Sequence, residues 1–506
     1  MKKLFYILLF FSAIANGQKS ELDVALKAQE AYDNFNYPKV IELYEDLEHG
    51  NAKAQRNLAN SYWKINDLAN AQRAYSRIVE MEDHTPEDLL RYAFLLRELT
   101  EYEESIEWME KYAKKEKNNA IVNDYIAYPT AHVPLLDTND QFEIVHLPYN
   151  SAHQEFGVCF IGDGVVFTSS RESFKSIKRQ YNATQLPFLD LYYADLYDST
   201  LNFIYPRPFN KAFRTKGHDG PATFSGDGNL IIFTANSSEK DSEGFYHLQL
   251  FWSKRSGKGW TKPQALNINE EGYSFTHPSL SADGKTLYFS SNKTGGKGGY
   301  DIYRCSISGD MQCGSTENLG DHINTSGNEI FPFIHPNGGM FFFSSDGKIG
   351  LGGQDIFACQ LNADNTIGSV HNLGTPINSS RNDFSFVLSK DLKRAYFASN
   401  REGGKGSDDI YGVNLKNPIV FHRSLKGVIL DESNRPAGAV KIRLVNATGK
   451  EIRTTYTDAD GRFDLKVENT DSLNISVEKS GYKTIQRPAS LSKVEPELKF
   501  RLKLEK

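Results

Sequence analysis

The pattern of hydrophobic and polar positions changes twice along the chain and so predicts three kinds of structure. Residues 18–119 repeat apolar positions at helical spacing, in units of about 34 residues. Between residues 141 and 418, short apolar runs rich in Tyr and Phe alternate with Gly-rich turns, which is typical of strands. Alternating runs continue over residues 424–506 with different turns. We expect an α-helical solenoid, an all-β repeat domain and a small β-sandwich.

The most regular stretch runs from Ser279 to Leu415, where three copies of one unit follow each other at a spacing of 54 residues. Each copy reads as strand, turn, strand, Gly-rich turn and strand, and a fixed period of this kind indicates a repeat architecture. The aligned positions, in order of the copies, are Asp283, Asn337 and Asp391; Tyr288, Phe342 and Tyr396; and Asp301, Asp355 and Asp409.

Two weaker copies precede these three, at Phe156–Leu196 and Pro221–Lys254. Asp190 matches the later Asp position in the first copy, whereas Gln249 replaces it in the second. A further strand-like run, 142–150, lies ahead of the first copy. It would complete the last sheet and close a ring without open edges. The sequence therefore predicts a five-bladed β-propeller over residues 141–418.

The repeated Asp follows a Gly-rich turn, where its carboxylate can accept backbone N–H bonds. We interpret Asp190, Asp301, Asp355 and Asp409 as a structural motif, because one carboxylate per turn falls far short of a calcium site. His153, His218 and His277 lie near the start of the first three innermost strands, but they are not in register. We therefore expect neither a metal site nor a cofactor.

In the helical region, small and large residues recur where two antiparallel helices would interlock. In the middle unit these are Ala59, Tyr62, Leu68, Ala71, Tyr75 and Ile78. The next unit has Ala93, Leu96, Tyr102, Ser105, Met109 and Tyr112 in the same packing roles. Residues 120–140 hold Pro129 and Pro134 without a sustained period and are predicted to form a linker.

The first residues predict export. Lys2 and Lys3 precede an apolar run of about a dozen residues and a small-x-small site, so we expect a signal peptide, 1–17, cleaved after Gly17. In an oxidising compartment Cys305 and Cys313, which flank a short turn, could form a disulfide, although buried thiols are an equal alternative. The net charge of −6, without a basic stripe, argues against a nucleic-acid partner.

Each region resembles a known family. The helical units resemble tetratricopeptide repeats, and the S-x-D-G-K-x-L-Y-F-S-S-N and G-G-x-D-I-Y motifs resemble the WD40-like PD40 repeats of periplasmic TolB-type propellers. The run from G-V-I-L-D to T-D-A-D-G-R-F-D-L resembles a carboxypeptidase-regulatory-like domain. In this order, the regions are similar to the PorE-like, OmpA-family envelope proteins of Bacteroidetes, which are associated with type IX secretion and gliding. The peptidoglycan-binding domain usual in that family does not follow, so peptidoglycan binding is not supported.

The resemblance implies a periplasmic protein that binds outer-membrane or periplasmic proteins and reaches the outer membrane through such a partner. Nucleophile-elbow, zinc-protease, P-loop and dinucleotide motifs are absent from the sequence, so we expect no catalytic residues and no enzyme. Three functions are considered: a non-catalytic scaffold for an outer-membrane complex, which we favour; a module that binds a glycan or peptide at the propeller mouth; and, least favoured, a hydrolase without a recognisable motif.

Overall fold

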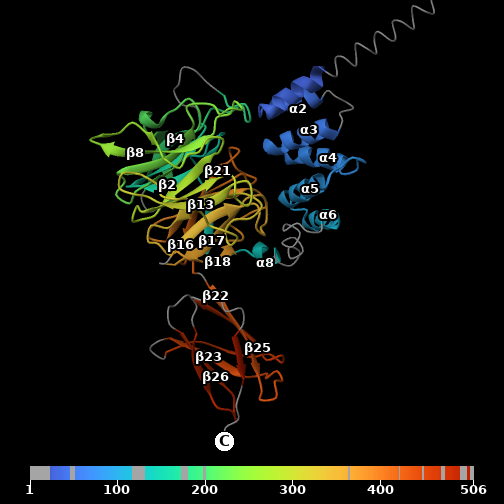
Figure 1. The fold of residues 1–506 in the computed structure, drawn as a ribbon, viewed down its shortest axis with the longest axis vertical. Helices are drawn as coiled ribbons and strands as arrows, with labels where there is room; N and C mark the ends of the chain where they lie inside the picture. Colours follow the sequence, from blue (N-terminus) through green and yellow to red (C-terminus); the bar gives the residue numbers. More distant parts are fainter. Residues whose placement is uncertain are drawn as a thin grey trace, which may run out of the picture. The chain divides into compact units, whose positions relative to one another are not determined.

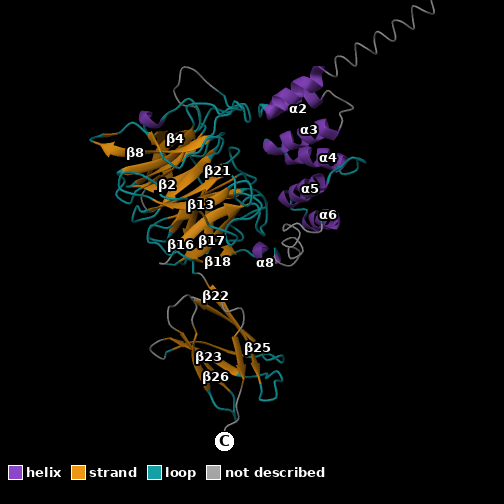
Figure 2. Ribbon diagram, viewed as in Figure 1, coloured by secondary structure: helices purple, strands orange, loops and turns teal. Residues whose placement is uncertain are grey.

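The computed structural model describes residues 23–45, 52–116, 132–171, 180–197, 201–362, 365–420, 422–446, 450–468, 473–489 and 498–501. The chain forms two compact units, Met1–Asn417 and Pro418–Lys506. Apart from a short 3₁₀ helix, Lys211–Phe213, helices occupy the first part of the chain and strands the rest (Figure 2). The predicted signal peptide and its cleavage site after Gly17 lie outside the described residues, as does most of the predicted linker. The short helix α8 (Val133–Leu136) lies at the end of that linker.

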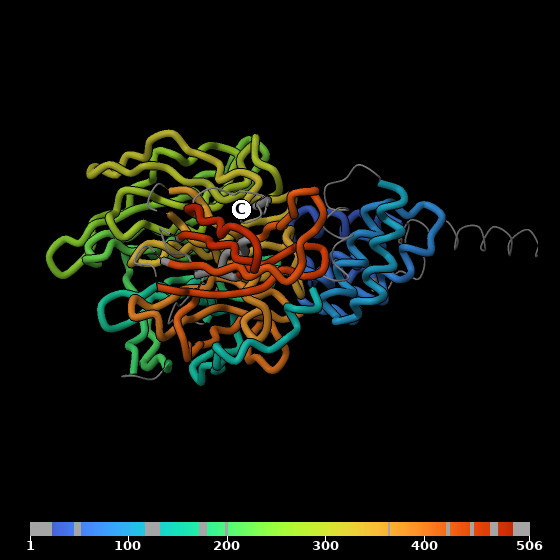
Figure 3. The backbone as a smooth tube through the Cα atoms, turned by 90° about the horizontal axis from the view of Figure 1, so that it is seen from below, coloured from blue at the N-terminus to red at the C-terminus, as the bar shows by residue number. Residues whose placement is uncertain are grey.

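The N-terminal helices form antiparallel hairpins that stack in chain order. Successive helices contact one another, and they lie side by side in two perpendicular views (Figure 1, Figure 3). A capping box formed by Thr85 and Asp88 starts α5 and satisfies backbone N–H donors at the helix end. Pro86 follows Thr85 and has no backbone N–H to satisfy. After a first helical segment at 23–33, the helices are α2 (Tyr37–Glu45), α3 (Ala52–Lys64), α4 (Leu68–Ile78), α5 (Pro86–Glu98) and α6 (Tyr102–Lys115).

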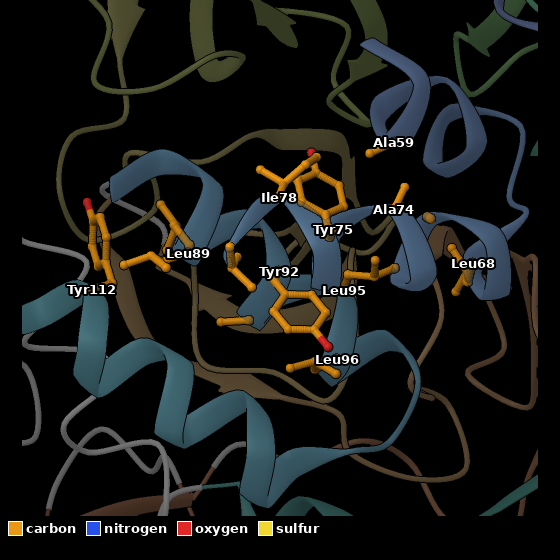
Figure 4. Packing of buried hydrophobic residues seen from close by; sticks show 14 of the residues in the cluster. Ala59, Leu68, Ala74, Tyr75, Ile78, Leu89, Tyr92, Leu95, Leu96 and Tyr112 are labelled. Atoms are coloured by element: carbon orange, nitrogen blue, oxygen red, sulfur yellow. The ribbon is translucent and has the colours of Figure 1, made fainter. Parts of the chain in front are cut away.

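The buried stripe of these helices follows the predicted positions named for the last two units, except that Tyr102 is only half-buried. Figure 4 shows Tyr75, Ile78, Leu95 and Leu96 packed in one cluster with Tyr112. Ala59, Ala71 and Ala93 are fully buried, so these small side chains lie where helices approach closely. Ser105 donates its hydroxyl hydrogen bond to the Ala93 carbonyl at 2.6 Å across the α5–α6 pair. The interlocking predicted from the period of about 34 residues is thus present in the structure.

The next part of the chain folds into five antiparallel sheets, four of them built from successive strands alone. The first sheet contains β2 (Glu155–Ile161), β3 (Gly164–Ser169), β4 (Asp190–Leu196) and β5 (Phe203–Pro208). The second contains β6 (Asp219–Phe224), β7 (Leu230–Asn236), β8 (Leu248–Ser256), β9 (Gly259–Trp260) and β10 (Gln264–Ala265). The third contains β11 (Phe275–Leu280), β12 (Thr286–Ser291), β13 (Asp301–Ser306) and β14 (Glu317–Asn318).

The fourth sheet contains β15 (Glu329–Ile334), β16 (Met340–Ser345), β17 (Asp355–Leu361) and β18 (Ile367–Asn372). The fifth contains β19 (Asp383–Leu388), β20 (Arg394–Ser399), β21 (Asp409–Leu415) and β1 (Phe142–His146). The first strands contact one another in the cyclic order β2, β6, β11, β15, β19 and back to β2, a propeller-like arrangement. β1 pairs with β21, Phe142 opposite Leu415, so a strand from the start of the domain completes its last sheet as predicted.

In four sheets an asparagine side chain forms two hydrogen bonds to the backbone of one residue in the third strand. In the fifth sheet the Asn150 amide donates to the Ile410 carbonyl at 2.8 Å and accepts from the Ile410 N–H at 3.1 Å. Asn324 bonds Ile302 in the same two-way fashion, and Asn378 bonds Ile356. Asn269 does so with Leu250 in the second sheet. Each amide replaces a missing strand neighbour, because it satisfies one backbone donor and one acceptor.

The second unit is a sandwich of two sheets. A three-stranded sheet, β25-β22-β28, pairs β22 with β28 in parallel, and a four-stranded sheet has the order β24-β23-β26-β27. Ile429, Ile442, Phe463 and Ile475 share one core between them. The strands are β22 (His422–Leu430), β23 (Lys441–Asn446), β24 (Glu451–Tyr456), β25 (Arg462–Glu468), β26 (Leu473–Glu478), β27 (Ile485–Ala489) and β28 (Leu498–Arg501).

Among the helices that the structure describes, none is long and apolar enough to cross a membrane.

We predict that Asn150→Ala lowers the unfolding free energy of the ring by about 2–4 kcal/mol, because it removes two hydrogen bonds and leaves a buried donor and acceptor at Ile410 unpaired. Denaturant unfolding followed by tryptophan fluorescence measures this. Asn414→Ala is the control, since this amide, in the same sheet, makes a single long bond of 3.4 Å to Glu143. Equal losses in the two variants would contradict the clamp.

Candidate functional site: the central cavity

The first strand of each sheet lies at the centre of the ring, and we call β2, β6, β11, β15 and β19 the inner strands. All five contain a bulge at the same place. Pairing between the first and second strand of each sheet shifts register at this point. The residue in the bulge has a positive φ in every sheet: Gly157 (66°), Gly220 (109°), His277 (52°), Phe331 (51°) and Ser385 (55°). Non-glycine residues rarely adopt this backbone conformation, so three of the five positions carry strain that their surroundings must offset.

These bulges line a cavity of about 620 Å³. Its wall is formed by all five inner strands and by the hairpin turns that follow them, including Gly162, Asp227, Ala282 and Pro336. The volume falls within the usual range of small-ligand sites, and the position on the axis of a ring is where such domains leave space. The cavity is therefore the candidate functional site.

An aromatic cluster lies at the bulge end of the cavity. His277 stacks on Phe331 with ring centres 3.8 Å apart, and Phe331 contacts Phe384 at 5.2 Å. Phe156 contacts both phenyl rings, at 5.9 and 5.8 Å. Burial lowers the pKa of His277 to about 3, so the imidazole is neutral at physiological pH. His277 and Phe331, the two members of the cluster that line the cavity, therefore present an uncharged aromatic surface to it.

The opposite end carries the charged side chains. Arg255, Lys390 and Asp227 are the charged residues among those lining the cavity, all of which are described. Hydrogen bonds from the Ser225 hydroxyl and from Asn229 lower the pKa of Asp227 to about 2, so its carboxylate stays ionised and is held within its own turn. Glycoside hydrolysis by two carboxylates needs two acidic groups near the reacting bond. Asp227 is the single acidic residue among the described residues that line this cavity.

The predicted Asp motif lies outside this cavity and organises turns. Asp301 accepts from the backbone N–H of Lys297 at 2.6 Å and of Gly298 at 3.1 Å, and from the Asn318 amide at 2.7 Å. Asp355 repeats this pattern with Leu351, Gly352 and Asn372. Asp409 bonds Lys405, Gly406 and the His146 ring. Asp190 occupies the matching place at the start of β4 and is also buried.

Sequence reasoning missed a second set of buried carboxylates, at the start of the inner strands. Glu155, Asp219, Glu329 and Asp383 are fully buried. Each accepts a backbone N–H from a Ser or Thr four residues earlier, at distances of 2.6–2.9 Å. The spacing S/T-x-x-x-D/E could have identified them. Arg401 and Arg171 pair with two of these acids, Asp383 and Glu155, at 2.6 and 3.3 Å.

The structure separates the three histidines of the sequence analysis. His277 lines the cavity, whereas His218 packs against Tyr181 and Phe188 and accepts the Leu189 N–H at 3.2 Å. His153 has a buried Nδ1 and is absent from the cavity lining. Among the described residues, no group of three His, Cys, Asp or Glu side chains could hold a metal ion.

All four cysteines are free thiols in the structure. Cys305 and Cys313 are buried in one hydrophobic cluster with Met311. Their side chains are in hydrogen-bonding contact, and this contact together with burial raises the pKa of the Cys305 thiol. The Cys305 thiol thus stays protonated beside Cys313, and the disulfide between the two residues stays a prediction.

Comparison with known proteins bears on two parts of the chain. Residues 424–503 match the family model of the carboxypeptidase regulatory-like domain, which confirms that prediction. No curated protein matches the chain in sequence.

Several solved structures are similar to the chain. An α-L-arabinofuranosidase from Lactobacillus brevis shares 12% identity at a TM-score of 0.31, with 52% of this chain and 89% of that one covered. An endo-arabinase from Bacteroides thetaiotaomicron shares 11% identity at a TM-score of 0.35, with coverage of 55% and 97%. A prolyl endopeptidase shares 12% identity at a TM-score of 0.28, with coverage of 64% and 38%.

These similarities correct one prediction. The expectation that the chain is not an enzyme, which came from the missing motifs, is contradicted because the similar structures are enzymes. Catalytic groups that folding brings together from distant positions need not leave a short motif, so motif absence was too weak a basis. At such low identity and TM-score, the likeness carries neither substrate nor mechanism to this chain.

We predict that His277→Phe flattens the pH dependence of stability between pH 6.5 and 5. The unfolded imidazole gains a proton near pH 6.5, whereas the buried one resists protonation down to about pH 3, so falling pH favours the unfolded chain. The wild type should lose up to about 2 kcal/mol more than the variant over this interval. Phe331 occupies the matching bulge in the next sheet, so the change is tolerable in size. Parallel pH slopes in urea titrations would contradict this.

We also predict that Cys305 and Cys313 join under oxidising conditions. The crosslink would close a loop of nine residues and raise the unfolding free energy of the protein by about 2–3 kcal/mol. Alkylation of the oxidised, denatured protein should label Cys159 and Cys359 alone, and a reductant should lower the melting temperature. Cys305→Ser should abolish this reductant effect, whereas Cys159→Ser should preserve it. Four labelled cysteines after oxidation would contradict the prediction.

Proposed function

We propose that the five sheets form a five-bladed β-propeller of the PD40 type whose central cavity binds a glycan or a peptide. The observation that carries the proposal is the cavity itself, which lies on the axis and is lined by all five inner strands. Its wall combines aromatic rings at one end with charged side chains at the other, the mix of apolar surface and few polar groups that small-ligand sites use. The helices before it would be tetratricopeptide-like repeats.

The surrounding network supports this proposal because it holds the cavity wall rigid. Inner strands bond one another through side chains: Ile334 N–H donates to Ser279 Oγ at 3.0 Å, and Leu280 N–H donates to Thr223 Oγ1 at 3.2 Å. A wall fixed in advance loses little entropy when a ligand binds, which favours affinity. The periplasmic location and the scaffold role at an outer-membrane complex stay predictions, and a pull-down from solubilised envelope would test them.

A thermal-shift screen of the full chain tests the binding function. We expect at least one oligosaccharide or short peptide to raise the melting temperature in a saturable way, because a ligand that binds only the folded state stabilises it by mass action. Ala282→Trp, which places a large ring at the cavity mouth from an exposed position in a hairpin turn, should abolish this rise. Ala265→Trp in strand β10 is the control, because this alanine is also exposed but does not line the cavity, and it should preserve the rise. A shift that survives Ala282→Trp would place the ligand elsewhere.

A further inference from the structure

The cavity carries more positive than negative charge at its hairpin-turn end. Lys390 and Arg255 come from different sheets, and Asp227 is the acid among the lining residues. Neighbouring turn carboxylates are held in their own hairpins: Asp283 bonds Ser281 Oγ at 2.6 Å, and Asp391 bonds Ser389 Oγ at 2.6 Å. Neither of these two acids lines the cavity. A ligand entering here meets two cations, although the chain as a whole has a net charge of −6.

The two cations are available to a ligand. Lys390 is exposed, and its structural role runs through its backbone carbonyl, which accepts from the Asn337 amide at 3.0 Å. The Arg255 guanidinium lies over the Trp260 ring at 5.0 Å, and its Nε donates a long bond of 3.4 Å to the Gly228 carbonyl. Stacking holds the guanidinium near the mouth and leaves its terminal nitrogens to donate to an anion.

The hydroxyl groups of the interior are largely engaged within the protein, whereas the buried Nδ1 of His277 has no hydrogen-bond partner among the described residues. The hydroxyl oxygens of Thr223, Ser279 and Ser385 already accept backbone N–H groups, from Leu280, Ile334 and Gly157. Beyond them lie the neutral His277 ring and Phe331, stacked at 3.8 Å. An apolar side chain gains from such a surface, whereas a sugar would have to give up hydrogen bonds to water without full replacement.

We propose that the ligand is an acidic peptide segment that places an apolar side chain, best an aromatic one, against the Phe331 end while its carboxylates meet Lys390 and Arg255. This inference rests on the proposed function of the cavity and adds the chemical class of its ligand. The positive charge at the mouth favours a ligand with negative charge. The aromatic end favours an apolar residue between the charged residues of that ligand.

Calorimetric titration of the full chain with three capped tripeptides tests the proposal. The probes are acetyl-Glu-Phe-Glu-amide, acetyl-Gln-Phe-Gln-amide and acetyl-Glu-Ser-Glu-amide, with xylobiose and a glucuronic acid disaccharide as sugar probes. We expect the Glu-Phe-Glu peptide to bind tightest and the other two peptides to bind about tenfold more weakly, one for loss of charge and one for loss of apolar burial. Raising the salt concentration should weaken only the two acidic peptides.

Variants at the mouth sharpen the test. Lys390→Ala should weaken binding of the Glu-Phe-Glu peptide about fivefold and leave the Gln-Phe-Gln peptide unchanged. Lys393→Ala is the matched control, because it removes an exposed lysine from the same hairpin turn but outside the cavity lining. Both side chains are exposed, so neither change threatens folding.

The outcomes separate the two proposals. If the Gln peptide binds as tightly as the Glu peptide, or if the two lysine variants behave alike, the acidic-peptide inference is wrong and the binding function stands. If only a sugar binds, the inference is again wrong, and the ligand is a glycan. If no peptide and no sugar binds, and the screen finds no ligand either, the proposed function fails together with the inference.

Discussion

One backbone hydrogen bond joins neighbouring sheets and holds the ring together. The first residue of an inner strand donates its N–H to the carbonyl of the residue that precedes the repeated Asp in the sheet before it. Glu329 bonds Tyr300 at 2.6 Å, and Asp383 bonds Gln354 at 2.7 Å. The bond from Glu155 to Asp408, at 2.8 Å, links the first sheet to the fifth. With the pairing of β1 and β21, this contact joins the two ends of the domain.

The same junction explains why carboxylates are buried on both of its sides. Asp355 and Asp409 hold the turn that presents the acceptor carbonyl, and Asp383 and Glu155 hold the turn that presents the donor. Burying charge is costly, and these hydrogen bonds offset part of that cost. At Asp355 burial still raises the pKa to about 6. Where Gln249 replaces the Asp, the junction differs, and Leu248 N–H bonds Ser274 Oγ at 3.2 Å instead.

The central cavity follows from this rigid frame. Four of the five inner strands, β2, β6, β15 and β19, donate a hydrogen bond to the preceding sheet from their first residue. The bulge residue that follows has a positive φ in all five sheets. The bulge residue differs from sheet to sheet, from Gly157 to Phe331, and this difference makes the cavity asymmetric. A repeated backbone thus supports a wall whose chemistry is specific to each sheet, which is how a symmetric scaffold carries a selective site.

The sequence by itself determined the local and periodic features. The 54-residue spacing predicted the register of the last three sheets, and the extra strand at 142–150 predicted the partner of β21, because both depend on patterns within short stretches. The buried helical positions followed from the 34-residue period for the same reason. The small sandwich was visible from its alternating strands, and its family match agrees.

Only the tertiary structure decided what the cavity contains. His277 and Phe331 are 54 residues apart and so hold the same place in successive copies, but their spacing does not show that they line one cavity with Lys390 and Arg255 from two other sheets. The absence of short motifs was too weak a basis for expecting no enzyme, since folding can bring together groups from distant positions. Likewise, the buried acids Glu155 and Asp383 lie at the contact with a neighbouring sheet, to which their backbone N–H groups donate. Their burial depends on the packing of sheets rather than on local sequence.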